Sequence, residues 1–222
     1  MKLLYAGNGK IKNLNGFPRK SVFYYTVKRL FDIVGGLFGL IISAIPISIL
    51  AFKIKQDGGP IFYSQERIGK NGEAFIMYKL RSMVINADDL KDQLMEKNEL
   101  HGGMFKMKED PRVTEIGCFI RHYSLDELPQ FWNVVRGEMS LVGPRPCLAR
   151  ELSKYSDYDK QRLLVKPGIS GLWQVSGRSN LDFKDMIKLD LQYIGERSIR
   201  NDLKICYQTV RLVLFSADPG AY

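Results

Sequence analysis

An uninterrupted apolar stretch constrains the fold of this chain more than any other feature. Residues 33–52 read IVGGLFGLIISAIPISILAF, twenty residues without a charge. A helix of that length is about 30 Å long, which matches the hydrocarbon core of a bilayer. Buried helices of soluble proteins rarely run this far without a polar face. The stretch also lies too far from the N-terminus to be a cleaved signal peptide. We therefore predict a membrane-embedded helix.

The flanks of this stretch favour a helix that enters the membrane and returns. Pro46 lies near its middle, where it removes one backbone hydrogen bond and kinks the helix. Lys28 and Arg29 precede the stretch, and Lys53 and Lys55 follow it. A helix that crosses the bilayer normally has one flank depleted of cations. We therefore expect a re-entrant helix with both ends on the cytoplasmic side.

The composition of the chain indicates that the rest of it is a folded, basic domain. Of 222 residues 26% are charged, and 33 Lys+Arg against 24 Asp+Glu give a net charge of +9. That excess predicts an anionic partner: nucleic acid, anionic lipid or a phosphorylated substrate. We expect a loose arm over residues 1–23, an interfacial and re-entrant membrane helix over 24–56, and a cytoplasmic catalytic domain over 57–222.

Local patterns predict a compact, mostly helical α/β domain. Short β-rich runs at 61–63 and 74–79 flank a glycine-containing loop and predict a hairpin. Residues 166–171 are turn-rich and predict a loop. Apolar periodicity and capping signals predict four helices, at residues 86–100, 124–136, 182–197 and 202–215.

The segment around Asp126 is the strongest chemical candidate. Ser124 followed by Glu127 reads as a capping box, which predicts a helix start. Backbone N–H groups at a helix start bind phosphate and favour an ionised carboxylate. Such a carboxylate at Asp126 could attack phosphorus, and Glu127 could hold a divalent ion. The alternative is that both acids only stabilise the helix.

Several cations lie in rigid or glycine-flanked settings. Prolines on both sides restrict the backbone of Arg145, and the planar guanidinium of arginine suits a diphosphate. Each cation alone could equally form a surface ion pair, but the group together favours a polyphosphate site. Its members are Lys79, Arg81, Arg121, Arg145 and Arg178.

Together these segments resemble the bacterial sugar transferases known as monotopic phosphoglycosyl transferases. The resemblance runs from about Tyr24 to Tyr222. The spacing of SLDELPQ and SLVGPRP within residues 124–146 is highly specific. The other matching stretches are KRLFD at 28–32, MYKLRSM at 77–83, KPGISGLWQVSGR at 166–178 and LDLQYI at 189–194.

The resemblance implies a reaction in two halves. Asp126 matches the nucleophile and Glu127 its partner, and both are implied ligands of Mg²⁺. Residues implied around the phosphate and metal are Lys79, Arg121, Arg145 and Asp190. Attack on a UDP-sugar would release UMP and leave sugar phosphate on Asp126. Undecaprenyl phosphate would then accept it, in the first membrane step of capsule, exopolysaccharide or O-antigen synthesis.

The resemblance also implies a place and partners. These are the cytoplasmic face of the bacterial inner membrane and contact with phospholipid. By analogy with the family, the chain could also form a homodimer. Residues 86–120 and the terminal GAY resemble the hexose-1-phosphate branch, which favours glucose or galactose and leaves N-acetylhexosamines open. The short stretch before Tyr24 leads us to expect a compact form without further N-terminal membrane helices.

Two other function classes remain open. Asp157 and Asp159 form a D-x-D triplet, typical of metal-dependent glycosyltransferases, although a solvated helix face also explains it. The net charge permits a membrane-tethered nucleic-acid-binding module, but the sequence contains no recognised nucleic-acid motif, so we expect no such partner. His122 could line the site, and Trp173 and Gln174 could contact nucleotide or lipid, although loop packing also explains these two.

Overall fold

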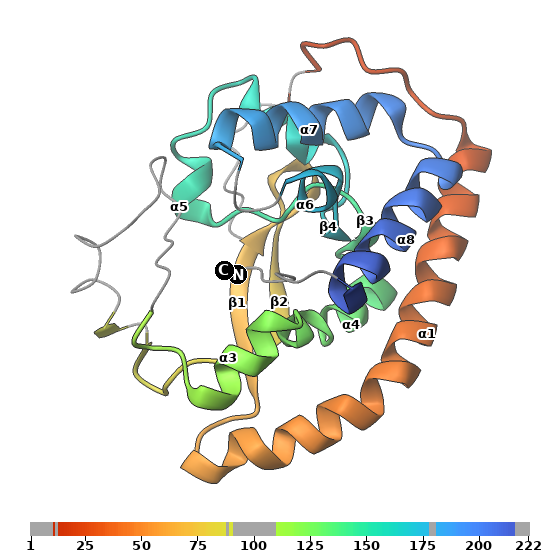
Figure 1. Ribbon diagram of the computed structural model, residues 1–222. Coiled ribbons are helices and arrows are strands. Elements are labelled where there is room, and N and C mark those ends of the chain that lie inside the picture. Colours follow the sequence, from red (N-terminus) through yellow and green to blue (C-terminus); the bar gives the residue numbers. More distant parts are fainter. Residues whose placement is uncertain (1–10, 12, 88, 91–109, 178–180, 216–222) are drawn as a thin grey trace.

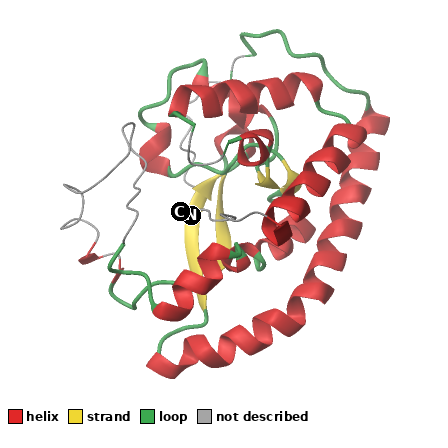
Figure 2. Cartoon of the chain, in the orientation of Figure 1, coloured by secondary structure: helices red, strands yellow, loops and turns green. Residues whose placement is uncertain are grey.

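The computed structural model describes residues 11, 13–87, 89–90, 110–177 and 181–215. Over these residues the chain is mostly helical, with two small two-stranded sheets. Figure 2 shows the helices arranged around the strands. The expected compact, mixed α/β class is confirmed. The helix expected over residues 86–100 lies largely outside the described residues.

The long apolar helix is α1, Val22–Ile54, which begins where the Ser21 hydroxyl accepts a hydrogen bond from the Tyr24 N–H. The helix is continuous through Pro46, and Figure 1 shows it running along one side of the domain and then turning beneath it. Its most apolar part has a mean hydropathy of 2.4 with only 22% of residues buried. By length and composition, α1 is therefore able to cross a membrane.

Glycines let α1 approach the domain closely. A Cβ added at Gly35 would lie 2.4 Å from Leu141, and one added at Gly39 would lie 2.5 Å from the Phe131 ring. Side chains on other faces of α1, such as Ile41 and Ile45, are exposed. The small residues therefore form the packing face in this part of α1, whereas Leu50 and Ile54 near its end are buried in the core.

Ion pairs and hydrogen bonds join the first half of α1 to the domain. Arg29 donates to the carbonyls of Val134 and Val135 at 2.7 and 2.6 Å. Lys28 forms an ion pair with buried Asp202 at 2.6 Å. Carbonyls in the last turn of a helix need donors from elsewhere, and Arg29 supplies two of them.

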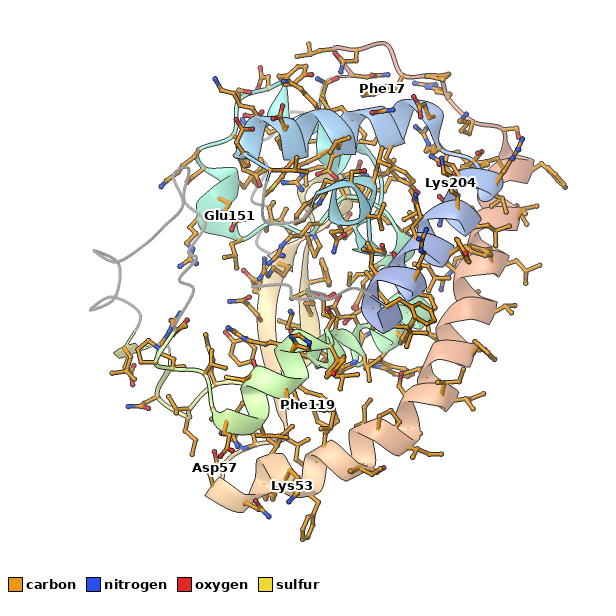
Figure 3. The ribbon with its side chains drawn as sticks, viewed as in Figure 1. Phe17, Lys53, Asp57, Phe119, Glu151 and Lys204 are labelled. Atoms are coloured by element: carbon orange, nitrogen blue, oxygen red, sulfur yellow. The ribbon has the colours of Figure 1, made fainter. Side chains whose placement is uncertain are left out.

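A second connection fixes the far end of α1. Arg81 forms an ion pair with Asp57 and donates to the Ile54 and Pro60 carbonyls. Figure 3 labels Asp57 beside the end of α1. The helix is therefore held to the domain at both ends.

The predicted hairpin is confirmed. Strand β1, Phe62–Ile68, pairs antiparallel with β2, Ala74–Leu80, and Tyr63 lies opposite Lys79. Two helices follow, α3 (Glu115–His122) and α4 (Gln130–Arg136). Helix α4 packs on both β2 and α1, so it connects the hairpin to the membrane helix.

A second, parallel sheet lies beside α8. Strand β3 (Ser140–Val142) pairs with β4 (Gly168–Ser170), and β4 lies within residues 166–171, which we expected to be a loop. The helices expected over 182–197 and 202–215 are confirmed as α7 (Phe183–Glu196) and α8 (Ile199–Phe215). A core cluster lies between these elements. Its buried members are Val142, Ile187, Leu191, Tyr193, Ile194 and Ile205. Two short helices complete the described elements, α5 (Ala149–Leu152) and α6 (Leu172–Ser176).

Candidate active site

The segment that carries Asp126 is not the regular helix start that we predicted. Ser124 adopts a left-handed backbone conformation (φ 54°), and its side chain makes no capping hydrogen bond. Asp126 and Glu127 instead lie on a single 3-10 turn, Leu125–Glu127, and α4 begins only after Pro129. The capping-box interpretation is therefore wrong. The left-handed residue introduces a small local backbone strain between α3 and the turn that carries Asp126.

Lys79 joins the two carboxylates. Its Nζ lies 2.7 Å from Oδ2 of Asp126 and 3.3 Å from Oε1 of Glu127. Asp126 is buried, with 8% of its surface exposed. A buried carboxylate needs a compensating charge, and a cation from β2 supplies it. The two acids and the lysine therefore form one cluster, although they lie 47 residues apart in sequence.

Arg145 lies on a loop that is held from several directions. The N–H of Gly143 donates to the Ser170 carbonyl and the N–H of Gly168 to the Pro144 carbonyl, both at 2.9 Å. Beyond the arginine, the N–H of Ile68 donates to the Cys147 carbonyl at 2.8 Å. These backbone bonds explain why the loop after β3 has a fixed course.

A shallow pocket extends from Lys79 and Glu127 to Arg145. Asp126 is not among its lining residues and is joined to it through Lys79. The pocket encloses about 270 Å³, part of which is open to solvent. Two of its polar residues, Arg67 on β1 and Gln130 at the start of α4, were not predicted as site residues. The lining also includes Met77, Lys79, Glu127, Arg145, Pro146, Gly168, Ile169 and Gln174.

Buried Arg67 binds the loop that carries Arg145 through a hydrogen bond. Its Nη1 donates to the Pro146 carbonyl at 3.0 Å and its Nη2 to Gln65 at 2.7 Å. Burial, and then the charge of nearby Arg145, lower the pKa of Arg67 to about 10. Two cations held this close repel one another, so an anion between them is favoured.

The structure places the other predicted residues differently. Arg121 interacts electrostatically with Asp126, which opposes the lowering of the Arg121 pKa by burial. Arg81 is instead engaged with Asp57 at the end of α1. Asp190 is buried in α7 and pairs with Arg162 at 2.5 Å. Neither Arg81 nor Asp190 lines the pocket, and Arg178 lies outside the described residues.

Buried Asp190 has an environment typical of a structural ion pair. Burial raises the pKa of Asp190 to about 6, and the Arg162 guanidinium opposes this rise. Arg162 also donates to the Tyr155 hydroxyl at 2.9 Å. The pair connects α7 to the residues before β4, and β4 contributes Gly168 and Ile169 to the pocket. Its effect on the pocket is therefore indirect, through the position of β4.

Of the remaining candidate residues, only one lines the pocket. Gln174 lines the pocket and donates to the Ile169 carbonyl at 3.2 Å. Trp173 is buried outside the lining, and the His122 ring packs edge-on against Tyr123. Asp157 pairs with Lys160 at the surface, and Asp159 accepts hydrogen bonds from Ser156. The D-x-D carboxylates are thus engaged in local surface contacts away from the pocket.

The cluster offers a limited set of metal ligands. Within the described residues, no group of three or more His, Cys, Asp or Glu side chains could enclose an ion. Mg²⁺ commonly binds through only one or two carboxylates, with substrate phosphates and water completing its octahedron. Asp126 and Glu127 fit that pattern because both present carboxylate oxygens to the same Lys79 ammonium.

Comparison with known proteins identifies the family. The family model described as bacterial sugar transferase matches residues 23–216. The chain is 47% identical over 214 residues to the galactosyl transferase CpsE of Streptococcus agalactiae, covering 91% of this chain and 48% of that protein. It is 43% identical over 200 residues to the undecaprenyl-phosphate galactose phosphotransferase of Salmonella typhimurium, covering 88% and 42%.

A third relative matches over most of its length. The exopolysaccharide production protein ExoY of Rhizobium meliloti is 38% identical over 200 residues, which are 88% of each chain. The chain thus spans about half the length of the first two relatives and most of the third. The family model and these matches show that the chain belongs to the bacterial sugar transferase family.

Proposed function

We propose that this chain transfers a sugar 1-phosphate from a UDP-sugar to undecaprenyl phosphate and releases UMP. The observation that carries the proposal is that Lys79 pairs with Asp126 and Glu127 and lines one pocket with Glu127, Arg67 and Arg145. A nucleophilic acid beside cations suits attack on a negatively charged diphosphate. Relatives named as undecaprenyl-phosphate galactose and glucose phosphotransferases support the same reaction class.

The first half-reaction is a displacement at the sugar-bearing phosphorus. An oxygen of Asp126 forms a bond to that phosphorus, and the bond to the bridging oxygen breaks. The electron pair leaves with UMP, and the sugar phosphate stays on Asp126. Lys79 orients the attacking carboxylate, and Arg145 binds phosphate oxygens.

The second half-reaction restores the enzyme. A phosphate oxygen of undecaprenyl phosphate attacks the same phosphorus, and the bond to Asp126 breaks. The products are the free carboxylate and a lipid-linked sugar diphosphate. Mg²⁺ bound by Asp126 and Glu127 would neutralise phosphate charge during both displacements. Galactose and glucose are the first donors to test, since the relatives' names include both.

Single-turnover chemistry tests the covalent step. Incubation of the wild-type chain with UDP-galactose or UDP-glucose and Mg²⁺, without lipid, should release about one UMP per enzyme. The protein mass should increase by one hexose phosphate. Asp126→Asn should give neither signal. Equal release by both proteins would remove Asp126 as the nucleophile.

Adding the lipid acceptor distinguishes the main alternative. With radiolabel in the β-phosphate of the donor, the proposed reaction moves the label into lipid. A glycosyltransferase that moves only the sugar would leave the label in free UDP.

The membrane arrangement is also part of the proposal. We infer that α1 is embedded in phospholipid as a re-entrant helix, with the domain on the cytoplasmic face of the inner membrane. The exposed apolar side chains of α1, the turn of the helix beneath the domain, and basic residues on both flanks support it. Single cysteines placed at residues 20 and 58 of a cysteine-free variant should both react from the cytoplasmic side. Labelling from opposite sides would contradict a re-entrant helix. The homodimer stays a prediction from the resemblance.

A further inference from the structure

Two buried hydrogen-bond donors line the candidate pocket without an acceptor. They are Nε of Arg67 and Nε2 of Gln130, and neither has a partner among the described residues. Arg67 is 7% exposed and Gln130 is 2% exposed. Buried donors in native proteins nearly always have an acceptor, so those that lack one need an explanation. Because both residues line the same pocket, a ligand in that pocket can supply the acceptors.

The charges around the pocket indicate the chemistry of this ligand. Arg67, Lys79 and Arg145 face it together with a single acid, Glu127. Lys79 is already paired with both Asp126 and Glu127. Within the described part of the chain, neither arginine has an ion-pair partner. The two arginines therefore offer two positive charges beside an amide donor. A phosphate group has the charge and the several acceptor oxygens that such a set requires.

We propose that Arg67, Gln130 and Arg145 form a subsite for a phosphate monoester, occupied in turn by departing UMP and by the attacking polyprenyl phosphate. This inference rests on the function proposed above. Arg67 and Gln130 thereby become substrate-contacting residues. One subsite then serves a product and a substrate that share only their phosphate.

In-line displacement explains why the two phosphates use one position. In phosphoryl transfer the attacking and leaving oxygens lie on opposite sides of the phosphorus. In the first half-reaction Asp126 attacks and UMP leaves from the opposite side. In the second, Asp126 is the leaving group, so the lipid phosphate attacks from the side that UMP vacated. Both steps therefore place a phosphate monoester opposite Asp126.

Competition on the unaltered protein is the first test. The full-length chain in detergent micelles is titrated with UMP in the presence of a short-chain polyprenyl phosphate. A shared subsite predicts that the apparent Kd of UMP rises in proportion to the concentration of the prenyl phosphate. The corresponding prenyl alcohol, which lacks the phosphate, should leave it unchanged. Simultaneous, independent binding of UMP and prenyl phosphate overturns the proposal.

A matched pair of substitutions provides the second test. Gln130→Met keeps the length of the side chain and removes the donor. Gln192→Met is the control, since Gln192 lies exposed on α7 and its amide donates to Glu196. Gln130→Met removes a hydrogen bond to a charged group, so the affinity for UMP should fall about 10-fold or more. Uridine affinity should stay unchanged in both variants.

The outcomes separate this inference from the proposed function. UMP affinity within about twofold of wild type in Gln130→Met refutes the role of Gln130. Should that variant misfold, the competition experiment on wild type still decides the shared subsite. Neither binding experiment requires turnover. A chain that binds UMP and prenyl phosphate competitively but transfers no sugar phosphate would refute the function and keep the subsite.

Discussion

Nζ of Lys79 lies 2.7 Å from Oδ2 of Asp126, and this ion pair connects the hairpin to the turn before α4. The lysine side chain is 21% exposed, and the aspartate side chain is 11% exposed. A partly desolvated pair interacts more strongly than a surface pair, because water screens it less. The orientation of the proposed nucleophile therefore depends on a strand distant in sequence.

Removing this lysine should reduce the chemical step more than substrate binding. Lys79→Met should slow UMP release about 10²–10³-fold, the usual cost of losing one oriented electrostatic partner. Lys188→Met is the matched control, because Lys188 pairs with Asp185 on an exposed face of α7. Rapid-quench measurement of UMP release checks both. Comparable rates for the two variants would contradict the role of Lys79.

A larger side chain at Gly39 should separate α1 from α4. The added Cβ would lie 2.5 Å from Phe131, so Gly39→Leu forces one of the two elements to move. Overpacking of this kind costs about 1–3 kcal/mol, and thermal unfolding in detergent should show it as a lower Tm. Ala44→Leu is the control, since Ala44 is exposed on the same helix. An unchanged Tm for Gly39→Leu would show that α1 does not pack as described.

The buried Arg162–Asp190 pair should be structural. Arg162→Met leaves the Asp190 carboxylate buried without its cation, which should cost about 3–5 kcal/mol of unfolding free energy. The loss should be smaller at pH 5 than at pH 8, because protonation of Asp190 removes the unpaired charge. Denaturant unfolding at the two pH values measures this. The double variant Arg162→Met/Asp190→Leu should recover much of the stability, and no recovery would contradict the pairing.

The ion pair at the end of α1 should give a stability contribution that is lost in acid. Hydrogen bonds from Arg81, and then from the Gly59 N–H, lower the pKa of Asp57 from 3.8 to about 2. The carboxylate therefore stabilises the fold above about pH 4, and this contribution disappears as the pH falls toward 2. The Tm difference between wild type and Asp57→Asn should shrink over that interval. Asp157→Asn, at an exposed pair, should change Tm little throughout.

Features with a local cause could be predicted from the sequence. The length of the apolar stretch predicted α1, and β-rich runs around a glycine-containing loop predicted the hairpin. The periodicity of apolar residues predicted α7 and α8. The carboxylates and Arg145 could be identified as candidates because rigid or polar neighbours surround them. Their convergence with Lys79 was implied only by the family resemblance.

Features that depend on distant partners could not be predicted. Arg67 lies in an ordinary strand, and its acceptor carbonyl on Pro146 is 79 residues away. Arg81 is two residues from Lys79, yet Asp57 and the end of α1 engage it. The capping-box prediction failed because Ser124 has a left-handed backbone, not the extended one of an N-cap, and its side chain makes no capping hydrogen bond. One available signal was overlooked: a buried arginine needs an acid, and Asp57 stands in the turn that precedes β1.

The two connections that hold α1 set how far the pocket stands from the lipid. Arg29 ties the helix to the end of α4, and Arg81 ties its last turn to the end of β2. With α1 embedded as proposed, the nucleophile stays at one height above the bilayer. A polyprenyl phosphate moves only within the plane of the membrane, so the two meet by a lateral, two-dimensional search. The rate of the second half-reaction should then follow the surface density of the lipid rather than its bulk concentration.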